Sequence, residues 1–244
     1  MVRLNRFIAS ATNYSRRQAD AFIKRGQVKV NGKVVTNLAT QVDINDKVEL
    51  DGKLLVPQRL VYYLVNKPAG YVCSLKDRHA ERLVVDLVPK NPPVFPVGRL
   101  DKDSRGLIVI TNDGQLAYQL THPKFAKEKE YYVSLDKEIK DKDKQHLLQG
   151  VSLPAGVGRF DLVERVDCQQ LDKWQKFYIK GMPKPVYRIV IHQGLKRQIR
   201  EMLKELGYQV KDLLRVRIAN IHLWDLPVGK YRKLRKSDIM RLIK

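Results

Sequence analysis

The sequence predicts an α+β chain in two parts, a small N-terminal module and a larger domain built on a mixed sheet. Two short amphipathic helix patterns and small hairpins follow one another within 1–50. A stretch with glycine, proline and little periodicity comes next, at 51–59. From Val61 onward, strand-like runs alternate with helical segments. We therefore expect an N-terminal domain at 1–50, a linker at 51–60 and a second domain at 61–244.

The N-terminal module begins with two helix patterns. Leu4, Phe7 and Ile8 recur at helical spacing and predict a first amphipathic helix. Ser15 is a favourable N-cap for a second helix, which Gly26 ends. A helix pair of this size can bury one apolar face against a small sheet.

Hairpins follow the helices. Valines alternate around Asn31-Gly32, which is a strong two-residue turn signal. A second strand pair is predicted in the segment 42–50, around Asn45-Asp46. The module therefore reads as two helices followed by two hairpins.

The second domain contains both periodicities. Strand-like runs occur at 61–65, 106–111, 129–135 and 186–192. Helical patterns occur at 114–120, after the capping pair Asn112-Asp113, and at 196–207, and the basic C-terminal tail predicts a short helix. This mixture indicates a sheet with helices packed on it.

The charge balance points to a polyanionic partner. The 244 residues include 47 Lys and Arg against 26 Asp and Glu, a net charge of +21. Such an excess favours nucleic acid over an anionic membrane surface, because neutralised phosphates release counterions. No apolar run approaches the roughly 18 residues of a membrane span, and the N-terminus lacks a secretory apolar core. Cys73 and Cys168 are too few for a disulfide scaffold, so we expect a reduced, cytoplasmic setting.

The segment 98–114, GRLDKDSRGLIVITNDG, carries the densest chemical signal. Asp101 and Asp103 stand among three cations in a loop with glycine at each end, followed by an apolar strand. A carboxylate surrounded by cations stays ionised, which suits a nucleophile or a base. The cations are Arg99, Lys102 and Arg105.

The residues of this loop are compatible with other structures. A calcium-binding loop is excluded, because Arg105 and Asn112 occupy positions where such a loop needs oxygen ligands and a glutamate. A solvated structural turn remains open on the residues alone, since paired charges in loops are usually structural. The five histidines show no ligand spacing, so no metal site is expected.

The same segment resembles the signature loop of the pseudouridine synthases, in the form found in the RsuA/RluB/RluF family of ribosomal enzymes. The resemblance implies that Asp101, in Gly-Arg-Leu-Asp, is the catalytic carboxylate. Ser104 stands where the family has threonine, a small hydroxyl exchange. The fold implied for 61–244 is a mixed, mainly antiparallel sheet.

Three further segments resemble the same family in the same order. The segment 64–74 contains Asn-Lys-Pro-x-Gly, and the resemblance implies that it supports the catalytic loop. The resemblance at 129–135 implies a catalytic role for Tyr131 rather than Tyr132. The resemblance at 193–203 implies that Arg200 is the basic partner of the carboxylate. On their own residues, Tyr131 and Arg200 would be interpreted as core packing and a solvated helix face. The expected supporting residues are Lys67, Pro68, Leu100 and Ile199.

Residues 2–33 resemble the S-four-type RNA-binding domain, named after a small-subunit ribosomal protein. Basic side chains and helix N-termini are ordinary phosphate ligands. In this domain the expected RNA contacts are Arg3, Ser15, Arg16, Arg17, Lys24 and Arg25. In the second domain they are Arg99, Arg105, Arg197 and Lys204.

Together these resemblances imply an enzyme that isomerises uridine to pseudouridine in ribosomal RNA. The reaction transfers no group to another molecule and involves no redox step, so no cofactor is expected. The expected partners are ribosomal RNA or ribosome assembly intermediates, and we expect a monomer. Large-subunit RNA is favoured as the target, with small-subunit RNA as the alternative. A non-catalytic RNA-binding assembly factor is the alternative from a different functional class.

Overall fold

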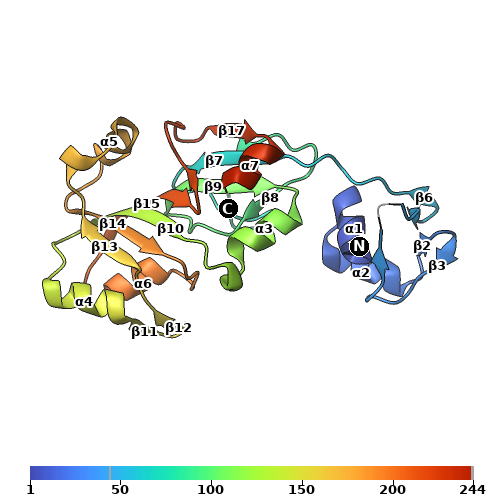
Figure 1. Ribbon diagram of the computed structural model, residues 1–244, viewed down its shortest axis with the longest axis horizontal. Coiled ribbons are helices and arrows are strands. Elements are labelled where there is room, and N and C mark those ends of the chain that lie inside the picture. Colours follow the sequence, from blue (N-terminus) through green and yellow to red (C-terminus); the bar gives the residue numbers. More distant parts are fainter. Residues whose placement is uncertain (44, 243–244) are drawn as a thin grey trace. The chain divides into compact units, whose positions relative to one another are not determined.

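The computed structural model describes residues 1–43 and 45–242, and the chain divides into two compact units (Figure 1). The first unit is Met1–Leu60 and the second is Val61–Lys244. Each unit has its own hydrophobic core.

The N-terminal unit packs two helices on small sheets. Its helices are α1 (Leu4–Ala11) and α2 (Arg16–Lys24). Its strands are β1 (Val2–Arg3), β2 (Val28–Val30), β3 (Lys33–Val34), β4 (Gln41–Val42), β5 (Val48–Leu50) and β6 (Lys53–Leu54). Ser15 caps α2 in a reciprocal capping box with Gln18, as the sequence predicts for the start of this helix.

The predicted strand pair around Asn45-Asp46 is wrong. Strand β4 pairs with β1, whereas β5 pairs with β2 and β6. Side-chain contacts explain this, because Asn31 donates to the Asp46 carboxylate at 2.8 Å and accepts from the Lys47 amide at 3.0 Å. The segment before β5 is therefore tied to the neighbouring hairpin turn and does not form a hairpin of its own. Ile44, within that prediction, lies outside the described residues.

The stretch predicted as a linker at 51–60 begins inside the first unit. Strand β6 lies in it and pairs with β5, and the Gln58 amide donates to the Ser10 carbonyl at 3.0 Å. Leu55 packs against the N-terminal core. The segment belongs to the N-terminal unit up to Leu60.

The second unit is built on one large sheet, whose main path runs β13-β14-β10-β15-β9-β7-β17. All its pairings are antiparallel except β9–β15, so the predicted mixed, mainly antiparallel sheet is confirmed. Strand β8 (Phe95–Val97) adds to β9, and β16 (Ile221–His222) adds to β15. The main strands are β7 (Tyr62–Lys67), β9 (Arg105–Thr111), β10 (Lys129–Leu135), β13 (Leu162–Arg165), β14 (Val186–Ile191), β15 (Val210–Ile218) and β17 (Tyr231–Leu234).

Helices cover both faces of this sheet. The core on one face includes residues of α4 (Asp141–Gln149) and α6 (Gln198–Glu205). The core on the other face includes residues of α3 (Gly114–Thr121), α5 (Lys173–Ile179) and α7 (Lys236–Leu242). A small hairpin, β11 (Val151–Leu153) with β12 (Gly156–Gly158), lies beside α6.

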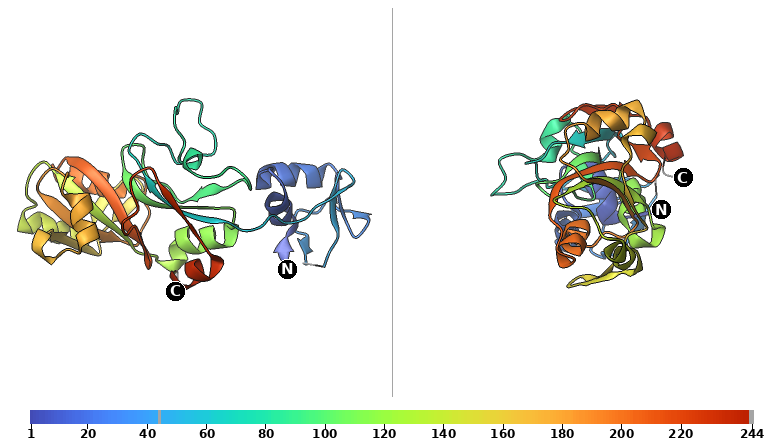
Figure 2. Two further views of the ribbon diagram at one scale, coloured as in Figure 1. Left: turned by 90° about the horizontal axis from the view of Figure 1, so that it is seen from above. Right: turned by 90° about the vertical axis from the view of Figure 1, so that its left-hand side faces the viewer.

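A long segment between β7 and β8 projects from the sheet and returns to it (Figure 2, blue-green). It contains the short 3₁₀ helix η1 (Val84–Leu87) and is closed by a bridge between Val72 and Leu83. Val84 is fully buried and anchors the segment to the core.

The parallel pairing of β9 with β15 depends on a close backbone approach. Gly106 has φ +105°, and a Cβ there would lie 2.2 Å from the Arg215 carbonyl oxygen. Only glycine fits such a contact. Beside it, Arg105 grips Asp212 through two nitrogens, at 2.6 and 3.0 Å. These contacts bring β15 against the strand that follows the signature loop.

Among the described residues, no helix combines the length and apolarity that a membrane crossing requires.

Candidate active site

The signature loop, 98–104, connects β8 to β9 and turns sharply at Asp101. The Asp101 carbonyl accepts a hydrogen bond from the Ser104 amide at 3.1 Å. The Gly70 amide donates to the Lys102 carbonyl at 2.7 Å, which joins the loop to the end of β7. The loop is thus fixed through its main chain.

A buried lysine completes this anchorage. Lys67 is fully buried, and its Nζ donates to the carbonyls of Ser104 (2.6 Å), Pro68 (3.0 Å) and Lys102 (3.2 Å). Burial lowers the pKa of Lys67 to about 8. All three ammonium donors are used by main-chain oxygens, so Lys67 holds the loop and its Nζ is committed to backbone contacts.

Asp101 lies at a cavity of about 720 Å³. Its walls come from the signature loop, β10, β15 and the segment that leads into α6. The expected supporting residues Leu100 and Ile199 are buried in these walls. A cavity of this size accommodates a nucleotide-sized ligand.

Two arginines face the Asp101 carboxylate. Arg197 Nη1 is 3.5 Å from Oδ2, and Arg200 Nε is 4.0 Å from the same oxygen. Both side chains belong to the start of α6. The carboxylate and both cations line the same cavity.

Arg200 is the more deeply buried of the two, with 14% of its side chain exposed. It donates to the Val210 carbonyl at 3.3 Å and to the Ser104 hydroxyl at 3.4 Å. Burial, and next the charge of Arg197, lower the pKa of Arg200. Arg200 thus connects α6, β15 and the signature loop around the carboxylate.

Arg197 is more exposed, at 38%, and differs from the role expected for it. The sequence suggested an RNA or structural contact along a helix face. In the structure, Arg197 precedes the helix with a left-handed backbone, φ +52°, and its side chain lies between Asp101 and Glu201. A helical periodicity cannot anticipate this, because the helix begins only at Gln198.

Tyr131, and not its neighbour Tyr132, lines the cavity. Alternation along β10 sends Tyr132 to the opposite face, where its hydroxyl accepts from Gln175 at 2.8 Å. Burial raises the pKa of Tyr132. Tyr131 is almost completely buried, with 7% exposed, so its ring forms a wall of the cavity.

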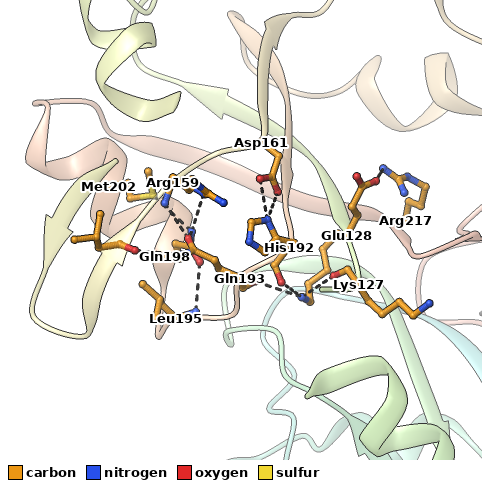
Figure 3. A network of polar contacts seen from close by, with 12 residues as sticks. Lys127, Glu128, Arg159, Asp161, His192, Gln193, Leu195, Gln198, Met202 and Arg217 are labelled. Atoms are coloured by element: carbon orange, nitrogen blue, oxygen red, sulfur yellow. Dashed lines mark hydrogen bonds and ion pairs between the residues drawn. The ribbon is translucent and has the colours of Figure 1, made fainter. Parts of the chain in front are cut away.

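A polar network shapes the segment before α6 (Figure 3). Gln198 is buried and donates to Gln193 Oε1 at 2.8 Å and to the Arg159 carbonyl at 3.1 Å. His192 contacts the Asp161 carboxylate at 2.8 Å. These contacts hold the segment that carries Arg197 toward the cavity.

Three cationic residues that line the cavity were not anticipated, and they are Lys129, Lys196 and Arg215. Lys129 Nζ donates to three backbone carbonyls, those of Lys127, His192 and Gln193. Burial lowers its pKa to about 8. The sequence contains a signal for two of them. Lys129 lies two residues before Tyr131 and so shares its strand face. Arg215 is a charged residue inside an apolar strand, which is unusual for a buried position.

The remaining basic residues expected at RNA in this unit divide into two groups. Arg99 is exposed and lines the cavity, and Lys204 is exposed on α6. The predicted RNA contact of Arg105 disagrees with the structure, because Asp212 holds its guanidinium and only 19% of the side chain is exposed. Pro68 supplies a carbonyl to Lys67.

In the N-terminal unit, the expected basic contacts are exposed on β1, on α2 and at the end of α2. They are Arg3, Arg16, Arg17, Lys24 and Arg25. Ser15 is different, because its hydroxyl is engaged with Gln18 in the capping box. Its contribution is therefore to begin the helix on which Arg16 and Arg17 lie.

Comparisons with known proteins identify the family of the chain. A family model described as RNA pseudouridylate synthase matches residues 61–205, and a model of the S4 domain matches residues 2–48. The dual-specificity RNA pseudouridine synthase RluF of Escherichia coli (strain K12) is 39% identical over 246 residues, covering 100% of this chain and 79% of that protein.

Two further relatives cover nearly all of both chains. The ribosomal large subunit pseudouridine synthase B of Bacillus subtilis (strain 168) is 35% identical over 244 residues, 99% of this chain and 96% of that protein. A crystal structure of a pseudouridylate synthase superposes with a TM-score of 0.65 at 27% identity, covering 99% of this chain and 100% of the other. The chain therefore belongs to the RNA pseudouridylate synthase family and carries an S4 domain at its N-terminus.

Proposed function

We propose that this enzyme converts specific uridines of large-subunit ribosomal RNA into pseudouridine, with Asp101 acting on the ribose. The observation that carries the proposal is the Asp101 carboxylate at a nucleotide-sized cavity, facing Arg197 and Arg200. Relatives named for RluF and for a large-subunit synthase support the choice of RNA.

The geometry suits cleavage of an N-glycosidic bond. An ionised carboxylate can attack ribose C1′, or it can remove the proton from C2′. The cavity is lined by Tyr131, whose ring offers a stacking surface for the detached uracil. The uridine must leave its stack to reach Asp101, because the carboxylate lies in the cavity wall.

The second part of the proposal concerns the exposed basic residues of the N-terminal unit. Their charges are available to phosphates, which fix the position of an RNA without reading its sequence. We propose that the S4 domain increases affinity for ribosomal RNA and that the second unit performs the chemistry. We further propose that the enzyme acts as a monomer in the cytoplasm, where it meets ribosomal RNA or assembly intermediates.

The test is the production of pseudouridine itself. Ribosomal RNA from cells with and without this protein is mapped for pseudouridine, and purified enzyme is then assayed on transcripts of the affected region. We expect a site in large-subunit RNA to disappear from the deletion strain. A lost site in small-subunit RNA would redirect the proposal, and unchanged maps would favour a non-catalytic assembly factor.

Asp101→Asn is the decisive variant, and Asp103→Asn is its matched control. Asp103 is an exposed carboxylate two residues further along the same loop. Asparagine keeps the volume of Asp101 but can act neither as nucleophile nor as base, so we expect folding and RNA binding without pseudouridine. Asp103→Asn should retain activity. Turnover by Asp101→Asn would remove Asp101 from the catalytic role.

A further inference from the structure

Arg215 differs from the other buried arginines of this unit. It is 3% exposed, lies in the middle of β15 and lines the cavity that contains Asp101. Its Nε donates to the Leu107 carbonyl at 2.7 Å. Its Nη2 is buried, and in the described part of the chain no acceptor contacts it.

Comparable arginines have carboxylate partners. Arg105 pairs with Asp212 at 2.6 Å, and Arg217, on the same strand as Arg215, pairs with Glu130 at 2.9 Å. Within the described ranges, Arg215 makes no ion pair with a carboxylate. A buried guanidinium without a counter-charge is costly in free energy, so its retention in a cavity wall indicates a ligand that supplies the missing acceptor.

The fold places this group beside the expected position of the base. Tyr131 on β10 and Arg215 on β15 are direct partners across an antiparallel pair, so their side chains lie on the same face. On the other side, the close approach of Gly106 fixes the backbone of Arg215 next to the strand that follows the signature loop. Arg215 therefore lies between the aromatic wall and the loop of Asp101.

Lys129, on the neighbouring strand β10, also lines the cavity but cannot provide the same contact. All three of its donors are used by backbone carbonyls. A guanidinium has five N–H donors, and Arg215 directs one of them to Leu107. Arg215 thus keeps donors that a carbonyl or an anion can use.

We propose that Arg215 donates hydrogen bonds to a carbonyl oxygen of the target uracil and stabilises the uracil anion that forms when the glycosidic bond breaks. The inference rests on the proposed function. When the C1′–N1 bond breaks, its electron pair stays on N1 and spreads to the ring carbonyl oxygens. This holds whether Asp101 forms a bond to C1′ or removes the C2′ proton, in which case a C1′–C2′ double bond forms.

The later steps neutralise the uracil anion. Carbon 5 of the turned ring forms the new bond to C1′. In the first route this breaks the bond between Asp101 and C1′, and in the second route the C1′–C2′ double bond is lost as C2′ regains the proton from Asp101. The proton on carbon 5 is then lost to a base, and N1 takes up a proton. Arg215 is needed while the ring is detached and anionic. A fixed donor aimed at developing charge acts on the chemical step more than on ground-state binding.

The test compares two RNA substrates, one with uridine and one with 5-fluorouridine at the target position. Fluorine makes the ring a better leaving group, so cleavage depends less on external stabilisation of the anion. Glycosidic-bond cleavage is measured in single turnover, with RNA affinity measured separately. Arg215→Met should lower the rate with uridine by about 10²-fold, lower it clearly less with 5-fluorouridine, and change affinity less than about twofold.

Two further variants keep the result interpretable. Lys211→Met removes an exposed charge from the same strand and should match the wild type on both substrates. Arg215→Lys keeps the buried charge, and it should show the same substrate dependence with a smaller loss. It decides the matter if Arg215→Met does not fold.

Equal losses on uridine and 5-fluorouridine in the folded variants would overturn the inference, and so would a loss confined to affinity. Failure of the proposed function is a separate result, because the wild-type enzyme itself would then form no pseudouridine on any ribosomal RNA transcript.

Discussion

Arg197 Nη1 lies 3.5 Å from Asp101 Oδ2, closer than the Arg200 nitrogen that faces the same oxygen. The carboxylate is therefore shared by two cations of unequal burial. The deeper one, Arg200, also joins β15 to the signature loop, whereas Arg197 is divided between Asp101 and Glu201.

This arrangement predicts different results for the two arginines. Arg200→Met should reduce the single-turnover rate strongly and lower the free energy of unfolding by about 1–3 kcal/mol, because its contacts to Val210 and Ser104 are lost. Arg197→Met should reduce the rate less and unfold near the wild-type temperature, because the side chain is partly solvated.

The measurements are single-turnover kinetics at saturating RNA, thermal unfolding and RNA affinity at two salt concentrations. Lys204→Met is the comparison for a loss of RNA affinity alone, since Lys204 is an expected RNA contact exposed on the same helix. If Arg200→Met reacted at the full rate once saturated with RNA, Arg200 would belong to the RNA-binding surface and not to the Asp101 group.

Lys67→Met should damage the loop rather than the chemistry alone. The methionine removes the Lys67 donor from the carbonyls of Pro68, Lys102 and Ser104. The Lys102 carbonyl keeps its bond from the Gly70 amide, and each buried carbonyl left unsatisfied costs about 1–3 kcal/mol. We expect a lower unfolding free energy in urea and a greatly reduced rate. Unchanged stability would show that water or another donor replaces the Lys67 ammonium.

Removal of residues 1–60 should leave a folded second unit. Each unit has its own core, and strand β6 is retained by the first unit, so the cut belongs after Leu60. The truncated enzyme should unfold cooperatively and bind ribosomal RNA more weakly, with a smaller dependence of affinity on salt. Aggregation of the fragment, or unchanged affinity, would contradict this division of roles.

Stability should respond to alkaline pH through Lys129. Burial lowers its pKa from 10.5 to about 8 in the folded protein. Between these values the unfolded chain binds more protons than the folded one, so this group makes the free energy of unfolding rise with pH. The wild type should therefore gain more stability than Lys129→Met between about pH 8 and 10.

Urea denaturation at several pH values measures this difference. Lys211→Met provides the control, because it removes an exposed lysine from a neighbouring strand. It should keep the wild-type slope. Parallel curves for the wild type and Lys129→Met would show that Lys129 keeps an ordinary pKa when folded.

The residues that local patterns describe well are those in regular elements. Strand-like apolar and aromatic runs predicted the strands β7, β9, β10 and β14, and the capping residue Ser15 predicted the start of α2. These features depend on neighbours in the chain, which a sequence displays directly.

The parts that sequence patterns missed depend on pairing between distant segments. In the sequence, Arg105 looks like one more cation of the loop. In the structure it is bound by Asp212, which lies over a hundred residues later in the chain. Arg215 enters the cavity because β15 pairs in parallel with β9, a neighbour relation that no periodicity reveals. Helices α4 and α5 were missed because α4 is highly charged and α5 is short.

The contacts of Lys67 have an evolutionary consequence. Its ammonium grips the carbonyls of Lys102 and Ser104, which every amino acid possesses, and leaves the exposed side chains of Lys102 and Asp103 free. Substitutions at those two positions can therefore change the charge presented to RNA without moving Asp101. The charge of the loop can therefore vary while the main-chain anchorage of the catalytic loop stays constant.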